Sequence, residues 1–502
     1  MMGSLAGDLG ERWGRSYESL IGHIIGLTIA VAGIGIFASG LVDAMRGGPD
    51  VVVLLSLGVV VALAGMLVWR FTILPSQIRI LDVFITVTLA WTVLAAVGSL
   101  PYLLTGWIPA VDDALFESVS GFTTTGATVL RPIEGTGPGV LFWRALSQWM
   151  GGMGVIVLVV AVLPTVGSGG MSLLEAEAPG PTGERLTPRV RQTARRLWAV
   201  YVGFTILLAL AYVAAGMSVF DGVAHSFTTV STGGFSPYNS SVGHFDSAAI
   251  EWICIGAMFI AGSSFTLLYR FLRGRPGPLL KSKEFHLYSA VVVGVACIIF
   301  AVNDATGSIA DRARGALFTT LTVVSTTGYA TDDFGVWSEA AQAVIIILLP
   351  IGAMAGSTAG GVKMIRVLAI ASYTHREGLR HLHPRLVRPV RVGGGIMPDA
   401  VANKIVAFLA LALITFGGGA LMIALTGPDM ITSFSAAATA FGNVGPGLGE
   451  VGPTHDFLEL PRFARWVTMG QMLLGRLEIY PVILALSVVT LRRRHRSLEL
   501  DA

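Results

Sequence analysis

The sequence predicts an all-α polytopic membrane protein that is built mainly from a fourfold internal repeat. Of its 502 residues, 53% are hydrophobic and 13% are charged, whereas soluble globular proteins carry about 25% charged residues. Several apolar runs reach the roughly 20 residues that cross a bilayer as a helix. Between these runs, short segments rich in threonine and glycine recur.

Apolar runs predict about ten full membrane spans. The first, from about Leu20 to Val42, is too long for the hydrophobic core of a signal peptide, so we expect it to be retained. The spans lie near residues 18–43, 51–73, 80–104, 140–163, 197–217, 248–269, 286–303, 339–371, 399–426 and 464–490. Helical segments that are too short to cross lie near 113–124, 221–231, 315–326 and 432–442.

Basic residues predict the orientation of the spans. Lysine and arginine gather in alternate connections, a bias that is typical of cytoplasmic loops. The basic segments are 70–79, 185–196, 270–283, 376–391 and 492–496. We therefore expect a multi-pass protein of the cytoplasmic (inner) membrane with both termini in the cytoplasm. The basic loops suit anionic membrane lipids or a protein partner, and no nucleic-acid partner is expected.

The repeat is visible in four segments that end in a glycine loop. "DALFESVSGFTTTG" (113–126) and "GALFTTLTVVSTTG" (315–328) place Ala-Leu-Phe at the same distance before Thr-Thr-Gly. "GVAHSFTTVSTGG" (222–234) and "SFSAAATAFGNVGPG" (433–447) have the same form. A Gly-x-Met signature follows each reference glycine by about 24 residues. The reference glycines are Gly126, Gly233, Gly328 and Gly445.

Non-helical backbone within the membrane is tolerated where it is buried in protein or lines a water-filled path. Four such loops around one axis would form a ring of carbonyl oxygens, which can replace the hydration shell of K⁺. The short helices would also aim their partly negative C-terminal ends at the ion. Ordinary re-entrant turns or packing loops are the alternative, and the fourfold recurrence favours a cation filter.

Several motifs together resemble the TrkH/KtrB superfamily of potassium uptake proteins. They are "SGFTTTGAT", "TTVSTGGFSPYN", "TVVSTTGYATDDF", "FGNVGPG", "QWMGGMGVIVL" and "GSTAGGVKMIR". The two spans before the first repeat make the chain similar to the TrkH branch. The resemblance implies potassium uptake through four pseudo-symmetric repeats of span, pore helix, filter loop and span around one pore.

The resemblance implies four filter triplets that bind K⁺ through backbone carbonyls. They are Thr124, Thr125 and Gly126; Ser231, Thr232 and Gly233; Thr326, Thr327 and Gly328; and Asn443, Val444 and Gly445. Asn443 and Pro446 depart from the Thr-Gly pattern, which predicts an asymmetric and less stringent fourth loop. Gly126 stands where relatives that favour Na⁺ carry serine, so the resemblance favours K⁺.

The resemblance also implies the organisation and the partners. The expected segments are 1–79 with two extra spans, 80–170 as repeat one, 171–275 as repeat two with a preceding cytoplasmic loop, 276–390 as repeat three with a gating loop, and 391–502 as repeat four with a basic cytoplasmic tail. A homodimer is expected to sit on cytoplasmic TrkA-like regulatory subunits. Those partners would bind a nucleotide, NAD(H) or ATP/ADP, and this chain is expected to hold no cofactor.

A segment rich in small residues interrupts the eighth predicted span. "GAMAGSTAGGVK" (352–363) holds more Gly, Ser and Thr than a straight helix favours. We expect an unwound gating loop within the membrane below the filter; a close helix-packing face is the alternative. The candidate gate residues are Gly356, Ser357, Thr358, Gly360, Gly361, Lys363 and Arg476.

Arg476 lies well inside the last predicted span, where an unpaired charge is costly and usually functional. Counted from the reference glycine of its repeat, it has the same depth as the segment around Thr358. We therefore expect Arg476 to donate to carbonyls of the loop and to latch the closed gate. Pairing with Glu478 or with another acid of the inner helices is the alternative.

Other function classes find little support in the sequence. It contains no Walker loop, no cluster of His and Cys ligands and no paired carboxylates inside spans, so we expect no enzyme. A Na⁺-permeable pathway, or a symporter coupled to H⁺ or Na⁺, is the alternative, although ionisable residues within the spans are few.

Four further polar residues have mainly structural interpretations. Asp113 fits an N-terminal helix cap, and His225 fits a packing position. Asp332 and Asp333 follow the third loop, where they either concentrate cations or are solvated loop charges.

Overall fold

The computed structural model describes residues 17–75, 78, 80–162, 190–303, 307–392, 395–485 and 487. Most of the predicted cytoplasmic loop 164–196 and the basic tail at 492–496 therefore lie outside the described residues. The chain divides into two compact units, which we describe separately. The first unit comprises residues 1–106, 137–143 and 480–502, and the second comprises 107–136 and 144–479.

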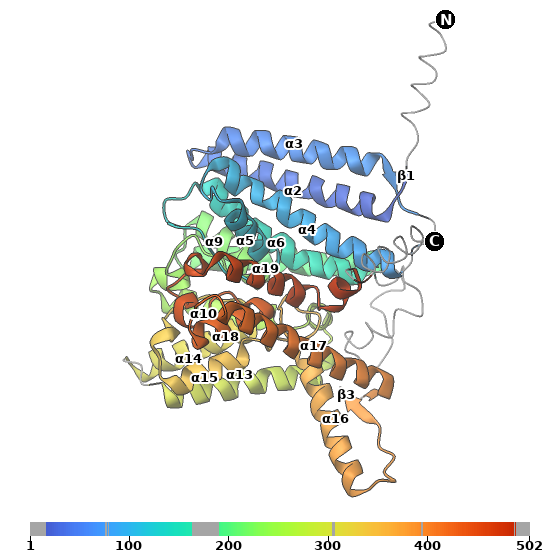
Figure 1. Ribbon diagram of the computed structural model, residues 1–502. Helices are drawn as coiled ribbons and strands as arrows, with labels where there is room; N and C mark the ends of the chain where they lie inside the picture. The colour runs from blue at the N-terminus through green and yellow to red at the C-terminus, as the bar shows by residue number, and fades with distance from the viewer. Residues whose placement is uncertain are drawn as a thin grey trace, which may run out of the picture. The chain divides into compact units, whose positions relative to one another are not determined.

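The first unit is built on three long helices that pack against one another. They are α2 (Leu20–Met45), α3 (Val51–Arg70) and α4 (Ile80–Thr105), and they run side by side in Figure 1. Two short parallel strands, β1 (Tyr17–Glu18) and β2 (Thr72–Ile73), pair beside them. The two extra N-terminal spans that the sequence predicts correspond to α2 and α3.

Glycines allow α2 and α3 to approach closely. A Cβ on Gly33 would overlap the backbone nitrogen of Ala62, and one on Gly58 would overlap the backbone of Phe37. Small residues at helix contacts are typical of membrane proteins, where close van der Waals packing drives association. Large apolar side chains such as Ile34 are exposed on the outside of α2, as expected for a surface that faces lipid.

The second unit contains the other described helices. The four helices that precede the glycine loops, called the short helices below, are α5 (Val111–Phe122), α9 (Val219–Val230), α14 (Ile309–Val324) and α18 (Met430–Gly442). Its other helices are α6 (Pro138–Val162, which begins in the first unit), α8 (Val190–Ala214), α10 (Ala248–Ala261), α11 (Phe265–Leu272), α12 (Gly277–Leu280), α13 (Lys283–Val302), α15 (Glu339–Leu348), α16 (Met364–Leu382), α17 (Asp399–Ala424) and α19 (Arg462–Arg476).

Short elements complete the second unit. The 3₁₀-helices are η2 (Ser241–Phe245), η3 (Phe334–Val336), η4 (Gly449–Val451) and η5 (Phe457–Glu459). An antiparallel pair, β3 (Val390–Val392) and β4 (Gly395–Met397), follows α16. In Figure 1, α16 and β3 extend away from the other helices of this unit.

The membrane-protein prediction agrees with the lengths and apolar character of the helices. Among the described residues, six helices are long and apolar enough to cross a membrane, and one bent pair would make a seventh. The six are α2, α3, α4, α8, α13 and α17. The part of the chain that the structure describes is thus mostly helical, with several candidate membrane spans and two small strand pairs.

Three predicted spans are broken in the structure. The sequence predicted one break, between α15 and α16. The continuous span predicted at 248–269 is wrong, because α10 and α11 meet at 105° across residues 262–264. The continuous span predicted at 464–490 is also wrong: α19 ends at Arg476, and Glu478 and Ile479 have φ of 61° and 60°.

The short helices lie where the sequence predicts them, and three begin at a side-chain cap. Ser218, Ser308 and Asp429 each accept a hydrogen bond from the backbone N–H three residues further on, which satisfies a donor at the helix start. In α5, by contrast, Asp113 lies in the first turn and pairs with Arg465. The prediction that Asp113 caps the helix is therefore wrong.

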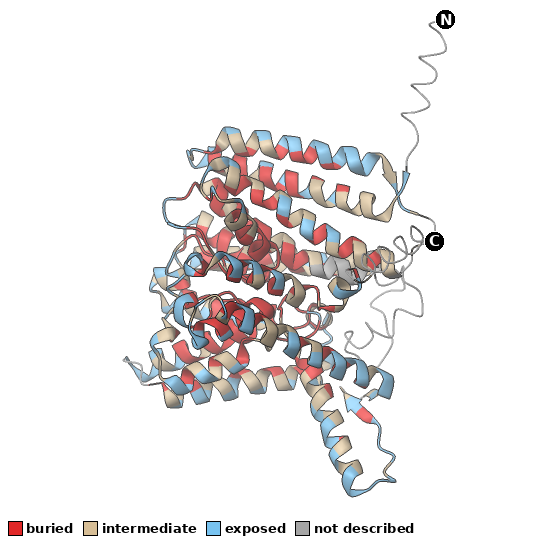
Figure 2. Cartoon of the chain, in the orientation of Figure 1, coloured by how far each residue is buried: buried red, intermediate tan, exposed pale blue. Residues whose placement is uncertain are grey.

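The short helices are largely enclosed by the rest of the second unit. Figure 2 shows buried residues concentrated among them. In α18, every residue from Thr432 to Gly442 except Phe434 is buried. A helix that is buried on nearly all sides does not need an amphipathic pattern, which is why the sequence indicates α18 by its motif and not by periodicity.

We expect Gly33→Val to destabilise the packing of α2 on α3, because an added side chain would overlap the backbone of Ala62. Overpacking of this kind typically costs about 1–3 kcal/mol, and thermal unfolding in detergent measures it. The matched control is Gly294→Val in α13, where nothing lies within 4 Å of an added Cβ. Equal losses of stability in the two variants would contradict the close approach.

Candidate functional site

All four short helices end in the same backbone turn. Each is followed by a residue with positive φ: Thr124 (53°), Thr232 (56°), Thr326 (59°) and Asn443 (55°). Two residues later stands a glycine with positive φ: Gly126 (83°), Gly234 (77°), Gly328 (79°) and Gly445 (108°). The residue between them donates its N–H to the carbonyl five positions back, at N···O distances of 2.9, 2.8, 2.9 and 3.0 Å. These bonds satisfy carbonyls that would otherwise be unpaired at the helix end.

Threonine is an unusual residue for this turn. A β-branched side chain with positive φ is a genuine outlier, yet three of the four loops place threonine there. Such strain persists only where the surrounding structure enforces it, and it clusters at functional sites. Asn443 reaches the same conformation at lower cost, because asparagine visits the left-handed region more readily.

The four loops approach one another in a closed cycle. A Cβ on Gly126 would overlap the carbonyl oxygen of Gly233 in the second loop. In the same way, Gly234 lies against the Thr327 carbonyl of the third loop, and Gly328 against the Val444 carbonyl of the fourth. The cycle closes where a Cβ on Gly445 would lie 2.7 Å from the Thr125 oxygen of the first loop. No residue with a side chain fits at these contacts.

This cycle corrects the register of the second loop. The sequence comparison aligned Gly233 with Gly126, whereas the backbone aligns Gly234 with it, by φ and by its contact with the next loop. Ser231 ends α9 with φ of −77°, in the helical region. The adjacent glycines in "STGG" allow either alignment in the sequence. The structure therefore matches Thr232, Gly233 and Gly234 with the other three triplets.

A cavity of about 590 Å³ opens onto the loops. One positive-φ glycine from each loop lines it, together with side chains of the segments that follow the loops. The threonine, serine, asparagine and valine residues of the predicted triplets are all fully buried. The loops therefore meet at the floor of an open cavity and are enclosed by protein behind it.

The segment between α15 and α16 is unwound, as the sequence predicts. Residues 349–363 form no helix, and a bridge between Ile351 and Val362 folds the segment back on itself. Thr358 Oγ1 donates to the carbonyl of Val230 at the end of α9 at 2.9 Å. Gly360 N–H donates to Thr326 Oγ1 at 2.8 Å. The unwound segment therefore packs directly against the ends of the short helices.

All the predicted gate residues lie in or against this segment. Ser357 Oγ donates to the Met354 carbonyl at 2.6 Å, and Lys363 Nζ donates to the Ala359 carbonyl. Gly356 and Gly361 both have positive φ, at 74° and 64°. The segment is thus held in one compact form by its own backbone and by short polar side chains.

Arg476 donates to the loop, as predicted. Its Nη1 lies 2.7 Å from the Thr358 carbonyl and its Nη2 lies 3.5 Å from the Gly151 carbonyl. The residue is 6% exposed and ends α19. Glu478, the alternative partner, instead accepts from Arg366 at 2.6 Å. The ion pair with Glu478 is therefore made by another arginine.

Sequence reasoning missed Glu284, which holds the unwound segment from α13. One carboxylate oxygen accepts from the N–H groups of Ala355 and Ile365, at 2.7 and 3.1 Å. The side chain is buried, and its other oxygen has no hydrogen-bond partner among the described residues. In the sequence, Glu284 stands beside two lysines and resembles a solvated acid in a first helical turn. Only the fold brings it to the loop.

The remaining polar residues have local roles. His225 is buried and contacts the Asp221 carbonyl and Ser236 Oγ, at 2.9 and 3.1 Å, as expected for a packing position. Asp333 accepts from the N–H of Gly335 at 2.8 Å. Desolvation raises the pKa of the Asp332 carboxyl, although the residue is exposed. Neither aspartate lines the cavity above the loops.

Comparisons with known proteins cover nearly the whole chain. A family model described as "Cation transport protein", TrkH, matches residues 51–289 and 279–492. The chain is also similar to proteins named "Trk system potassium uptake protein TrkH". The protein from Halomonas elongata is 39% identical over 413 residues, which cover 81% of this chain and 85% of that protein. The protein from Vibrio parahaemolyticus is 37% identical, with coverage of 94% and 98%.

A solved structure is also similar to this chain. The crystal structure of the potassium transporter TrkH from Vibrio parahaemolyticus superposes with a TM-score of 0.83 at 35% identity. The match covers 92% of this chain and 97% of the other. The helical fold described above is therefore similar to that of an experimentally determined transporter over almost its full length.

Replacing Glu284 by alanine should loosen the unwound segment, because two buried N–H groups lose their acceptor. Leaving buried donors unpaired costs about 1–3 kcal/mol, so amide exchange across residues 349–365 should accelerate roughly tenfold or more. Hydrogen–deuterium exchange measured by mass spectrometry on the detergent-solubilised protein gives the rate. Glu339→Ala, an exposed acid at the start of α15, is the control. Unchanged exchange in the Glu284 variant would contradict the anchoring role.

Proposed function

The chain belongs to the TrkH family of cation transport proteins, and on that premise we propose that it takes up potassium ions through a channel-like pore. The observation that carries the proposal is the closed cycle of four glycine loops. The relatives named as potassium uptake proteins support the choice of ion. The relatives are named as potassium uptake proteins, so the family consists of transporters and not of enzymes.

In this proposal the ring of loops is the selectivity filter. Backbone carbonyls of Thr124–Gly126, Thr232–Gly234, Thr326–Gly328 and Asn443–Gly445 replace the water around K⁺. Ser231, the first residue of the predicted second triplet, then lies just below the ring at the helix end. The short helices direct their partly negative C-terminal ends toward the same point, which favours a cation.

The fourth loop is the asymmetric member of this filter. Asn443 Nδ2 donates to Thr125 Oγ1 and to the Met472 carbonyl, both at 3.0 Å. The amide therefore ties the fourth loop to the first, where the other loops carry a threonine hydroxyl. At one of the four equivalent positions, the larger asparagine side chain replaces threonine. We therefore propose that this loop makes the filter less stringent than a fourfold symmetric one.

The unwound segment 349–363 acts as the gate below the filter in this proposal. Arg476 fixes the segment through the Thr358 carbonyl, and its own positive charge opposes the passage of a cation. Opening would require the Arg476 contact to break and the segment to withdraw. Gly356 in the middle of the segment and Gly361 near its C-terminal end both have positive φ and are suited to absorb that movement.

The wider organisation follows the family resemblance. We propose that residues 80–502 form four pore repeats, which follow the two extra spans of residues 1–79 in the sequence. Both termini of the chain lie in the cytoplasm in this proposal. The subunit forms a homodimer on TrkA-like regulatory subunits, which bind NAD(H) or ATP/ADP. The basic surface of α16 and the segment that follows it, from Arg376 to Arg391, is the proposed docking region for those partners.

A coupled symporter is the second candidate, and one observation favours it. Glu284 is a buried acid that sequence reasoning had not counted among ionisable groups within the spans. Such groups commonly carry protons in transporters. A pH jump imposed on proteoliposomes without a K⁺ gradient separates the two: ion movement driven by the pH step supports coupling, and its absence supports a channel.

Uptake of ⁸⁶Rb⁺ into sealed proteoliposomes tests the proposed function. We expect excess K⁺ to block uptake strongly and excess Na⁺ to block it weakly. Equal block by both ions would contradict a potassium-preferring filter. Empty liposomes and liposomes with heat-inactivated protein are the controls for leak.

Truncation of Arg476 should increase ⁸⁶Rb⁺ flux in the absence of any regulatory partner, because the latch on Thr358 is lost. We expect a rise of severalfold or more, since a hydrogen bond to a charged group contributes about 1.5–3 kcal/mol. Arg462→Ala, at an exposed arginine that pairs with Asp112, is the matched control. If the Arg476 variant folds and its flux equals that of the wild type, the latch does not exist.

A further inference from the structure

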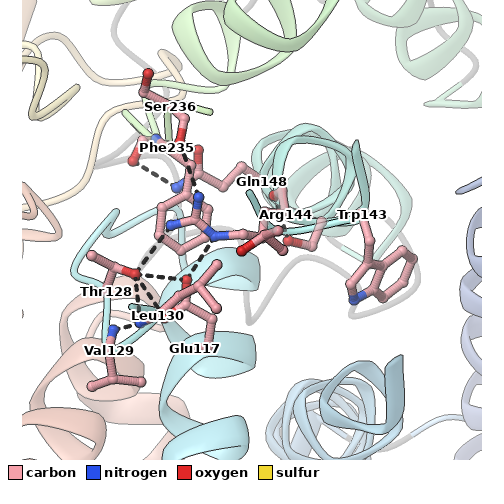
Figure 3. Close-up of polar contacts among 12 residues, drawn as sticks. Glu117, Thr128, Val129, Leu130, Trp143, Arg144, Gln148, Phe235 and Ser236 are labelled. Carbon is pink, nitrogen blue, oxygen red and sulfur yellow. Dashed lines mark hydrogen bonds and ion pairs between the residues drawn. The ribbon is translucent and has the colours of Figure 1, made fainter. Parts of the chain in front are cut away.

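A buried ion pair lies directly behind the first two loops. Arg144 of α6 donates from Nε to Glu117 of α5 at 2.8 Å, and their side chains are 2% and 0% exposed. Figure 3 shows Arg144 among contacts with Glu117, Thr128 and Ser236. Sequence reasoning paid no attention to this pair, because its members are 27 residues apart and look like unrelated charges.

Glu117 holds the segment that leaves the first loop. Its carboxylate accepts from Thr128 Oγ1 at 3.0 Å and from the N–H of Val129 at 2.9 Å. These residues follow Gly126 by two and three positions. The carboxylate therefore fixes the chain immediately after the glycine that meets the second loop.

Arg144 connects this anchor to the second loop. Its Nη2 donates to Thr128 Oγ1 at 3.1 Å, and its Nη1 donates to the carbonyl of Ser236 at 3.0 Å. Ser236 follows Gly234 by two positions, as Thr128 follows Gly126. The guanidinium also lies 4.1 Å from the centre of the Phe235 ring. One side chain thus bridges equivalent points of two loops.

Gln148 extends the same contact by one helical turn. Residues four apart share a face of a helix, and Gln148 lies beside Arg144 on α6. Its Nε2 donates to the carbonyl of Gly233 at 2.6 Å, and its Oε1 accepts from the N–H of Phe235 at 3.0 Å. The Gly233 carbonyl is the one that Gly126 lies against in the ring. Gln148 therefore acts on a carbonyl of the proposed filter itself.

Stability alone is a poor reason for such a network. Burying an ion pair costs desolvation energy that often cancels its attraction, and apolar residues of similar volume frequently stabilise a protein as well. A fully hydrogen-bonded polar network does, however, fix one arrangement of the groups it joins. Here the groups joined are the exits of two loops and one ring carbonyl.

The other two loops are held by different means. Tyr329, next to Gly328, donates its hydroxyl to the His225 carbonyl at 3.0 Å. Ser435 makes hydrogen bonds of 2.9 Å with both the N–H and the carbonyl of Leu448. Among the described residues, no ion pair contacts the third or fourth loop. The ion pair of Arg144 with Glu117 therefore distinguishes the first and second loops from the third and fourth.

We propose that Glu117, Arg144 and Gln148 are positioning residues that set the ion selectivity of the pore by fixing the first and second loops. This inference rests on the proposed function. When the network is removed, half of the ring relaxes and its carbonyls adapt to an ion of another size. Selectivity should fall while the pathway for ions stays open.

The test compares the competition of Na⁺ and K⁺ for ⁸⁶Rb⁺ uptake in variants reconstituted at equal amounts. We expect Glu117→Gln and Gln148→Met each to lower the ratio of Na⁺ to K⁺ needed for half-block by about fivefold or more, because each loses at least one strong hydrogen bond to a loop. Uptake of ⁸⁶Rb⁺ should remain measurable in both variants, because the pathway stays open.

Glu251→Gln is the matched control. Glu251 of α10 pairs with Arg314 of α14 at 2.6 Å, and their side chains are 13% and 18% exposed. This pair also joins a helix that precedes a glycine loop to a neighbouring helix and also lies largely within protein, but among the described residues no hydrogen bond connects it to a glycine loop. Its removal should leave the competition ratio unchanged.

The outcomes separate this inference from the proposed function. A wild-type protein that does not discriminate K⁺ from Na⁺ overturns the proposed function itself. A selective wild type with folded, equally selective Glu117→Gln and Gln148→Met variants overturns only the inference. If Glu117→Gln fails to fold, as judged by gel filtration, Gln148→Met decides alone, because it leaves no unpaired buried charge.

Discussion

Contact of backbone with backbone, at four places where no side chain fits, is the constraint on which the second unit depends. Each loop glycine lies against a carbonyl of the next loop, from Gly126 onward around the cycle. Two residues before each of these glycines, the backbone lies in the left-handed region. The strained threonines at Thr124, Thr232 and Thr326 follow from that geometry, because the turn needs a positive φ whichever residue occupies it.

Broken helices elsewhere in the unit are stabilised by one another. Helices within a membrane must satisfy every backbone polar group internally. Where α10 gives way to α11, the Gly262 carbonyl accepts from Met354 at 3.1 Å and Phe265 donates to the Gly356 carbonyl at 3.0 Å. The two breaks therefore supply hydrogen-bond partners to each other. Glu284 and Arg476 satisfy groups that these contacts leave over.

Buried charged side chains lie behind the ring of loops and against the unwound segment. Arg144 and Glu117 lie behind the first two loops, and Glu284 lies against the unwound segment. Each charge is turned toward backbone groups of irregular segments or of a helix start. A network of this kind helps to fix loops whose side chains are short and whose glycines offer no side chain for packing. The buried polar network is therefore a direct consequence of loop backbone that has no regular secondary structure.

Local patterns in the sequence determined most of the fold and part of the site. Apolar run length predicted most of the long helices, because a span needs about 20 apolar residues wherever it lies. The recurring Thr-Gly motif located all four short helices and three of the four loop registers. The small residues of 352–363 predicted the unwound segment, and the lone charge of Arg476 predicted its contact with that segment.

Tertiary structure alone decided the rest. The register of the second loop could not be read from "STGG", because two adjacent glycines fit the motif equally well and only the contact with Thr327 selects Gly234. The breaks after Ala261 and Arg476 depend on partners from distant segments. Glu284 and the pair of Glu117 with Arg144 looked like ordinary charges, because nothing local to a residue reveals which distant backbone its side chain will meet.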